Sequence, residues 1–157
     1  MKLDTFRQNQ EYFKEAKIMS PSYAHSMLLI TMGSEINKER KFRAFGELTL
    51  VINGKDYTPD ISVYKWRKAN YLSRDIVKME EMPLLTIEIV SPTQGKNDLF
   101  EKTEKYLEAG IKSGWIVDPQ THSIIVTDQN GIRHYHEGIL EDITGLNIDI
   151  GIIFEDG

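Results

Sequence analysis

Hydrophobic and polar positions recur along this chain with two different periods, and the change of period separates predicted helices from predicted strands. Residues 1–19 are polar and compatible with a helical extension. Ser22 is a favourable N-cap for a second helix over roughly 22–38, which we expect to be well buried. Tyr23, Met27, Ile30 and Ser34 follow helical spacing, and Leu28, Leu29 and Met32 widen the apolar surface of this helix.

From Phe42 onward the period changes to two, which is typical of β-strands. The alternation over 47–52 predicts one strand, and residues 60–64 predict another. Asn53-Gly54, which follows the first of them, is a strong signal for a tight turn. Residues 67–82 are mixed and charged, so we expect a loop there with at most a helical turn.

Residues 83–90 form a nearly continuous apolar run, which is typical of a strand buried on both faces. A helix over 98–109 follows, with Gly110 at its C-terminal cap. Further strands are predicted over 111–117, 123–127 and 146–150. The strand, helix and strand between 83 and 118 predict a right-handed parallel crossover. The fold class is therefore α/β (mixed α+β), with one domain over 1–157 built on a mixed sheet with flanking helices.

Composition limits the classes of protein to which this chain can belong. Hydrophobic residues make up 40% of it, which is enough for a core, and the absence of cysteine excludes disulfides and thiolate zinc sites. No apolar stretch approaches the roughly 20 residues of a membrane span, so we expect a soluble cytoplasmic protein. The net charge of −5 argues against tight non-specific DNA binding, although the basic stretches 38–43 and 65–68 are either a local patch or ordinary solvated surface.

Glu88 has the most informative position, because it is the only acid within the apolar run 83–90. A buried carboxylate is costly unless a cation, a metal ion or hydrogen bonds compensate for its charge. The simpler alternative is an acid at the exposed end of a strand, or one paired with a nearby Lys or Arg.

Asp60 follows Pro59 at the start of the preceding predicted strand. If the two strands are neighbours, Asp60 and Glu88 point into one cleft, where two like charges repel unless a cation or a proton offsets them. Mg²⁺ is commonly held by one or two carboxylates, with water and substrate phosphate completing its coordination. We therefore expect a Mg²⁺ or Mn²⁺ site here, able to polarise a phosphodiester and activate water.

Lys102 lies four residues after Asp98, beside the apolar stripe of the predicted helix. From this position it can reach toward the sheet and offset charge that builds up on a phosphate. A surface ion pair between Asp98 and Lys102 explains the same spacing equally well. Periodicity alone leaves both interpretations open.

These residues belong to an ordered set that resembles a known family. The set comprises Pro59-Asp60, Glu88-Ile89-Val90-Ser91-Pro92, Asp98, Lys102, Tyr106, Gly110, Trp115-Ile116-Val117-Asp118-Pro119 and Gly145-Leu146-Asn147-Ile148. It resembles the putative restriction endonuclease family of the PD-(D/E)XK nuclease superfamily over roughly residues 20–154. The resemblance implies a nuclease core and Mg²⁺-dependent cleavage of DNA.

The resemblance also implies roles for individual residues. Asp60 would match the motif aspartate and Glu88 the second acid, with the backbone carbonyl of Ile89 as a further metal ligand. The superfamily commonly has a lysine two residues after the second acid, where this chain has Val90. Residues 88 and 90 face the same way on a strand, so we expect Lys102 to fill that space.

Two weaker candidates come from the same resemblance. Glu47 occupies a position where the family carries an acid, and it is either a third catalytic carboxylate or an outward-facing strand residue. His25 follows Ser22 at a spacing that the family also shows, and a structural histidine is the simpler interpretation. We expect Trp115 and Tyr106 to pack in the core and not to stack on bases.

Two main functional hypotheses remain, with a structural one behind them. The first is a metal-dependent endonuclease acting on DNA. The second is a nuclease-fold module without catalysis that binds nucleic acid or a protein partner, which the acidic pI and Val90 favour. The third is a structural domain whose acids form only ion pairs. A homodimer, with Met79, Met82 or the last strand at its interface, is expected only by analogy.

Overall fold

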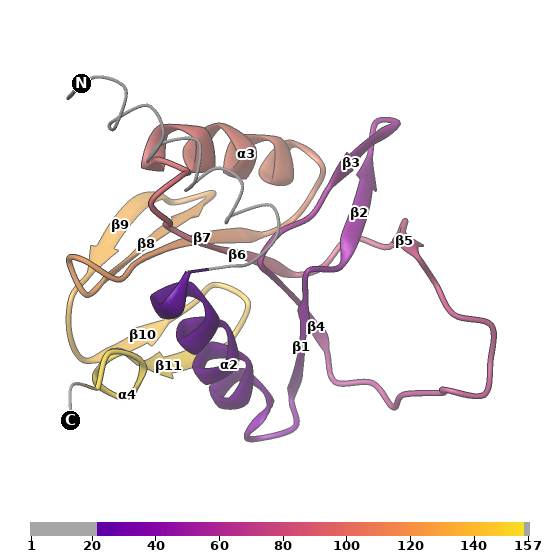
Figure 1. Ribbon diagram of the computed structural model, residues 1–157, viewed down its shortest axis with the longest axis horizontal. Coiled ribbons are helices and arrows are strands. Elements are labelled where there is room, and N and C mark those ends of the chain that lie inside the picture. Colours follow the sequence, from indigo (N-terminus) through magenta and orange to yellow (C-terminus); the bar gives the residue numbers. More distant parts are fainter. Residues whose placement is uncertain (1–21, 156–157) are drawn as a thin grey trace, which may run out of the picture.

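A six-stranded mixed sheet forms the centre of the computed structural model, which describes residues 22–155 (Figure 1). The predicted extension over 1–19 lies outside the described residues. In spatial order the strands are β1 (Phe42–Gly46), β4 (Ile61–Lys65), β6 (Leu85–Ile89), β7 (Ser113–Asp118), β8 (Ser123–Asp128) and β9 (Gly131–Tyr135). Strands β6 and β7 are parallel, and every other pair in this sheet is antiparallel.

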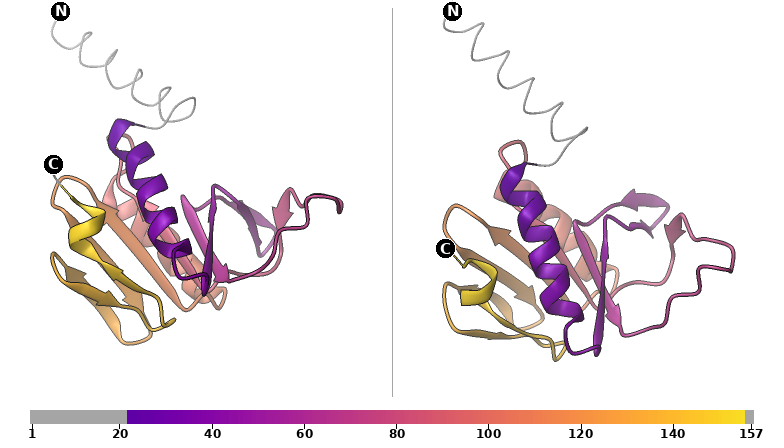
Figure 2. Two further views of the ribbon diagram at one scale, coloured as in Figure 1. Left: turned by 90° about the horizontal axis from the view of Figure 1, so that it is seen from below. Right: turned by 60° about the horizontal axis from the view of Figure 1, so that its bottom comes forward.

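Helix α3 (Lys96–Glu108) joins the two parallel strands, as the sequence pattern predicted. Gly110 follows the end of this helix with a φ of 95°, a conformation that favours glycine and stops the helix. The helix lies on one face of the sheet, opposite α2 (Tyr23–Asn37), as Figures 1 and 2 show. Alternation along β6 serves both layers, because Leu85, Ile87 and Ile89 face α2 while Glu88 faces α3.

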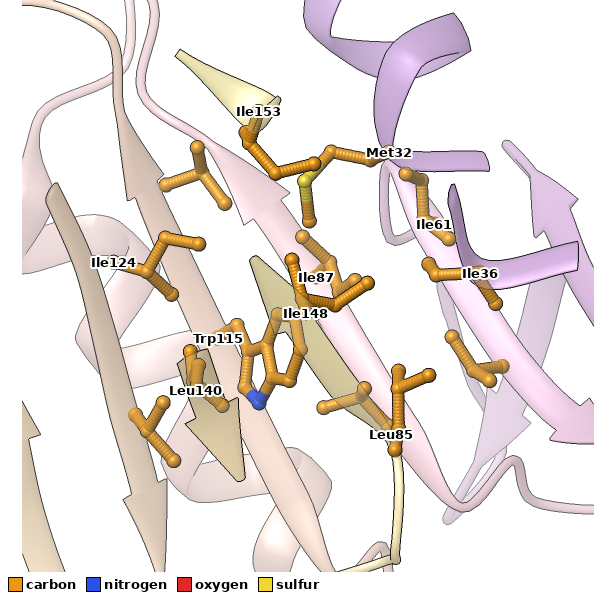
Figure 3. Packing of buried hydrophobic residues seen from close by; sticks show 14 of the residues in the cluster. Met32, Ile36, Ile61, Leu85, Ile87, Trp115, Ile124, Leu140, Ile148 and Ile153 are labelled. Atoms are coloured by element: carbon orange, nitrogen blue, oxygen red, sulfur yellow. The ribbon is translucent and has the colours of Figure 1, made fainter. Parts of the chain in front are cut away.

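The larger core lies between the sheet and α2. Helix α2 contributes Leu28, Met32 and Ile36, which pack against sheet residues such as Ile87 and Trp115 (Figure 3). The same face is completed by β10 (Ile139–Glu141), β11 (Asn147–Asp149) and the short helix α4 (Ile150–Ile153). On the α3 face a smaller cluster contains Leu99, Ile116 and Ile125, with Val90 and Phe100 packed against it.

Helix α2 has the predicted extent, but only part of its predicted apolar surface, including Leu28 and Met32, is buried. Its apolar stripe was expected at Tyr23, Met27 and Ile30, yet these side chains are 86%, 54% and 72% exposed. The buried stripe is Leu28, Met32 and Ile36, together with His25. Apolar residues surround most of this helix, so helical spacing fits two stripes equally well, and only the docked sheet selects between them.

The turn predicted at Asn53-Gly54 joins β2 (Thr49–Ile52) to β3 (Lys55–Tyr57), and both turn residues have positive φ. Such values suit the tight hairpin turn that this dipeptide favours. Glu47 precedes the hairpin and does not lie on a strand, which corrects the sequence prediction. It adopts a φ of 54° in the connection from β1, and its backbone N–H donates to the carbonyl oxygen of Asp60 at 3.0 Å.

Residues 66–77 form the predicted loop, but the loop ends before residue 82, where it was expected to end. After this loop β5 (Lys78–Met79) pairs in parallel with β2, in a strand too short for its pattern to be recognised. Met79 and Met82 pack against the buried cluster of Leu50, Ile52, Tyr106 and Ile111. Both side chains are only partly buried, and their expected place in a dimer interface stays a prediction.

The C-terminal segment contains the predicted last strand, but that strand is shorter than expected. Strand β11 ends at Asp149, whose Oδ1 accepts the Gly151 N–H at 2.9 Å and caps α4. Strands β9 and β10 were not predicted, because their exposed positions interrupt any apolar alternation. None of the helices within residues 22–155 has the length and apolar character needed to span a bilayer.

Candidate active site

Asp60 and Glu88 face each other where β4 begins and β6 ends. The antiparallel register pairs Ile61 with Ile87, which places Asp60 opposite Glu88. The backbone N–H of Asp60 donates to Glu88 Oε1 at 3.0 Å. Both acids are buried, with Asp60 9% exposed and Glu88 2% exposed. The pairing of two strands therefore brings together two carboxylates that lie 28 residues apart in the sequence.

The carboxylate of Asp60 is held from two further directions. Its Oδ2 accepts the backbone N–H of Ile89 at 2.8 Å, across the same pair of strands. Its Oδ1 lies 3.0 Å from Nε2 of His25, at an angle that is not that of a regular hydrogen bond. His25 is 1% exposed in the first turn of α2, where Ser22 caps the helix by accepting its N–H at 3.2 Å. The predicted N-cap is thus confirmed, and it fixes the backbone from which His25 reaches the acid.

Lys102 approaches the acids from the opposite layer. Its Nζ lies 4.0 Å from Glu88 Oε2, at the outer limit of an ion pair, and its side chain is 39% exposed. Among residues 22–155 there is no ion pair between Asp98 and Lys102, so the lysine extends toward the sheet. Val90, directly after β6, packs against Leu99, which lies one turn before Lys102 on α3. An apolar contact therefore occupies the position where the resemblance implied a lysine.

Tyr106 lies one helical turn beyond Lys102 and borders both acids. It is 1% exposed, and its ring packs edge-on against Tyr57 with centroids 5.8 Å apart. Burial raises the pKa of the Tyr106 hydroxyl, and the negative charges of Glu88 and Asp60 raise it further. The prediction that Tyr106 and Trp115 pack in the core is confirmed. Tyr57 was not singled out from the sequence, although it stands three residues before Asp60 at the end of the predicted hairpin.

A groove of about 450 Å³ opens on the surface beside this site. It lies between β3 and α3 and is lined by Tyr57, Gln94, Asp98, Glu101, Lys102 and Lys105. Lys102 belongs both to the groove and to the surroundings of Glu88, so it connects solvent with the buried acids. The lining of the groove carries two ammonium groups, of Lys102 and Lys105, and two carboxylates, of Asp98 and Glu101.

The oxygen donors of Asp60 and Glu88 suit a hard divalent cation. An ionised carboxylate offers about four lone-pair sites, so hydrogen bonds to Asp60 Oδ2 and Glu88 Oε1 leave room for coordination. Mg²⁺ commonly takes one or two carboxylates and keeps several waters. Residues 22–155 contain no group of three or more His, Cys, Asp or Glu side chains arranged as a metal site. Glu47 is exposed, and roles for it and for the Ile89 carbonyl as catalytic or metal-binding groups stay predictions.

Asp118 lies on the same face of the sheet as Glu88 but has its own compensating cation. It is 4% exposed, and its Oδ2 lies 2.8 Å from Nζ of Lys96. Burial alone would raise the pKa of Asp118, but hydrogen bonds from Lys96, the Gln120 N–H and Thr121 lower it below the ordinary value of 3.8. The turn predicted at Asp118-Pro119 is present, and the acid stabilises it by accepting the Gln120 N–H at 2.9 Å.

Comparison with family models matches this chain to the Uma2 family over residues 8–145. The description of that family is “Putative restriction endonuclease”. A comparison with curated proteins gave no match.

A similar solved structure is that of a protein from Anabaena variabilis ATCC 29413, described as “a putative nuclease belonging to DUF820”. It is 26% identical, with a TM-score of 0.74 over 85% of this chain and 82% of that one. A DrdV–DNA complex matches 78% of this chain and 10% of that one at 13% identity, and its TM-score of 0.40 is too low to support an argument. The expected fold class, a mixed sheet flanked by helices, is confirmed.

Proposed function

This chain belongs to the Uma2 family of putative restriction endonucleases, and on that premise we propose that it hydrolyses DNA phosphodiester bonds in a metal-dependent reaction. The observation that carries the proposal is the buried acid pair Asp60 and Glu88, held by reciprocal backbone hydrogen bonds with Lys102 beside it. Buried acids are expensive to maintain, and a bound cation is a common reason for keeping them.

Asp60 and Glu88 would hold Mg²⁺ or Mn²⁺, with the Ile89 carbonyl as a further oxygen donor. When bound, such an ion polarises a phosphodiester and lowers the pKa of an attacking water. The protein's contribution is to keep the two carboxylates in place before the ion arrives. The hydrogen bonds across β4 and β6 do this, because they join each acid to the backbone of the other's strand.

Lys102 and His25 have separate tasks in this proposal. The Lys102 ammonium is partly exposed in the groove, where it can contact a phosphate and offset the charge that builds up during hydrolysis. His25 is a positioning residue, since its Nε2 contacts Asp60 Oδ1 from helix α2 and limits rotation of the carboxylate. With its raised pKa, Tyr106 remains a neutral phenol at physiological pH and closes the site against bulk water.

A catalytically inactive module that binds nucleic acid or a protein partner is the second candidate. The packing of Val90 at the position of the superfamily lysine favours it, because no ammonium can stand there. The two candidates differ in one respect: only the endonuclease needs the acids and the ion together.

The test is cleavage of supercoiled plasmid DNA by the purified full chain with Mg²⁺ or Mn²⁺ and with EDTA. We expect metal-dependent nicking or linearisation, reduced about 10³-fold by Asp60→Asn and by Glu88→Gln. Glu141→Gln, at an exposed acid on β10 outside the site and the groove, should leave cleavage unchanged. Equal cutting by all variants would identify a contaminating nuclease. Absence of cutting by the wild type, with DNA still bound, would favour the inactive module.

A further inference from the structure

The loop over residues 66–77 exposes an unusual amount of apolar surface. It joins β4 to β5 and extends away from the body of the molecule (Figure 1). Within seven residues, Tyr71 is 89% exposed, Leu72 100%, Ile76 58% and Val77 82%. Single exposed apolar residues are ordinary, but a cluster of this kind marks a contact surface.

Basic residues gather at the base of this loop. Strands β1 and β4 pair Phe42 with Lys65, and the Trp66 N–H donates to the Lys41 carbonyl oxygen at 2.9 Å. The fold thereby joins the two basic stretches that lie apart in the sequence. Segments 38–43 and 65–81 together carry nine Lys and Arg against four Asp and Glu, in a chain whose net charge is −5.

The base of the loop is fixed, so its tip is presented on a defined support. Arg40 and Arg43 lie over the Trp66 ring at 5.0 and 4.5 Å. Arg67 covers the Tyr64 ring and makes a bidentate pair with Glu81 at 2.8 and 3.1 Å. Lys38, Lys41 and Lys78 form ion pairs with Glu35, Glu39 and Asp56. In the described part of the chain no carboxylate forms an ion pair with the three cations that then remain, Lys65, Lys68 and Arg74.

We propose that the 66–77 loop is a DNA-contacting element that inserts Tyr71 and Leu72 into a groove of the duplex while Lys65, Lys68 and Arg74 neutralise phosphates. Apolar side chains that partly unstack base steps are a known means of gripping and bending DNA. Phosphate neutralisation by Lys and Arg supplies sequence-independent affinity. The inference rests on the proposed function, because it assigns the loop to the same substrate.

The position of the loop agrees with this assignment. Strand β4 runs from beside Asp60 to Lys65, which spans roughly 16 Å at the ordinary rise per residue. That distance corresponds to about five base pairs along a duplex. A second copy of this chain fits this surface less well than DNA does. A two-fold contact through the loop would bring the Lys and Arg side chains of one copy against the same side chains of the other, and like charges repel.

The test is binding of the full chain to a fluorescent duplex in EDTA, followed by anisotropy across a series of salt concentrations. Tyr71→Ser with Leu72→Ser should weaken affinity about tenfold and leave the salt dependence unchanged. Lys68→Ala with Arg74→Ala should lower the slope of log affinity against log salt by about two. Ile132→Ser, at an exposed apolar position on β9, is the matched control and should change neither.

A duplex containing 2-aminopurine gives a second measurement, since its fluorescence rises when the base is unstacked. Wild type should raise it and the Tyr71→Ser, Leu72→Ser variant should not. Wild-type affinity in both double variants would overturn the inference, and metal-dependent plasmid cutting would show that the proposed function still stands. Loss of self-association in the Leu72→Ser variant, or binding to anionic vesicles in place of DNA, would also overturn it. If the wild type neither binds nor cuts DNA, both proposals fail together.

Discussion

Asp60 and Glu88 are joined by a hydrogen bond from the Asp60 backbone N–H to Glu88 Oε1, and the Ile89 N–H returns a bond to Asp60 Oδ2. The two bonds measure 3.0 and 2.8 Å and cross the same pair of strands. Because each acid is held by backbone, the distance between them depends on strand pairing and little on side-chain rotamers.

Lys102→Met keeps most of the side-chain stem and removes its charge. We expect DNA cleavage to fall about 100-fold, because the ammonium beside Glu88 no longer offsets phosphate charge. The free energy of unfolding should change by less than about 1 kcal/mol, since the side chain is 39% exposed. Lys105→Met alters a lysine on the same groove wall and is the control. An equal loss in both variants would mean that the groove needs positive charge in general and that Lys102 has no special place.

His25→Phe preserves a ring of similar size and removes Nε2. If His25 orients Asp60, Mn²⁺ affinity measured by titration calorimetry should fall 10- to 100-fold, a typical effect of losing a group that orients a metal ligand. Leu28→Ala, on the same buried face of α2, should destabilise the fold by about 2–5 kcal/mol and leave Mn²⁺ affinity unchanged. A parallel fall of stability and metal affinity in both variants would reduce His25 to a packing residue.

Gly114→Ala places a methyl group where α3 touches the sheet. Its Cβ would lie 2.4 Å from Cγ2 of Thr103, so we expect a loss of about 1–3 kcal/mol in the free energy of unfolding, measured with urea. Thr103→Ser removes that Cγ2 and keeps the hydroxyl that donates to the Leu99 carbonyl oxygen. The double variant should therefore recover most of the loss, with a positive coupling energy. Gly33→Ala, a helical glycine with open space around it, should stabilise by up to about 1 kcal/mol.

Asp118→Asn tests the buried ion pair with Lys96 through the pH dependence of stability. The pKa of Asp118 lies below its ordinary value of 3.8 in the folded chain, so between these two values the unfolded chain binds more protons. The contribution of the Asp118 carboxylate to the free energy of unfolding is complete above its pKa in the unfolded chain. It is lost as the pH falls through its pKa in the folded chain. Urea unfolding below about pH 4 should show a shallower acid slope in Asp118→Asn, by up to about 1.4 kcal/mol per pH unit. Lys96→Met should flatten the slope in the same way, and an unchanged slope in both variants would contradict the assignment.

The sequence predicted those parts of the structure that depend on local pattern. The apolar run around Glu88 predicted a strand buried on both faces, and the Asn53-Gly54 signal predicted the hairpin turn; both predictions are confirmed. The juxtaposition of Asp60 and Glu88 was predicted on the condition that their strands are neighbours, and the pairing of β4 with β6 meets that condition.

Contacts that depend on tertiary packing could not be predicted in the same way. The sequence could not show which part of the apolar surface of α2 is buried, because an almost uniformly apolar helix has no unique stripe. Ile30, for example, was expected on the buried face and is exposed. The contact of His25 with Asp60 needs that rotation of α2, which the sequence does not encode locally. Strand β5 was missed because two residues cannot establish a period, and its partner β2 lies far away in the chain.

The acids stand on strands while Lys102 stands on α3, and this division affects how the chain becomes active during folding. A polypeptide that has formed β4 and β6 but has not yet docked α3 would already possess both carboxylates and still lack the ammonium. Under the proposed function, half-folded or locally unfolded molecules would therefore cleave nucleic acid more slowly than the folded protein. The absence of a side chain at Gly114 would then matter for activity, because Thr103 of α3 packs closely against this position when the helix docks on the sheet.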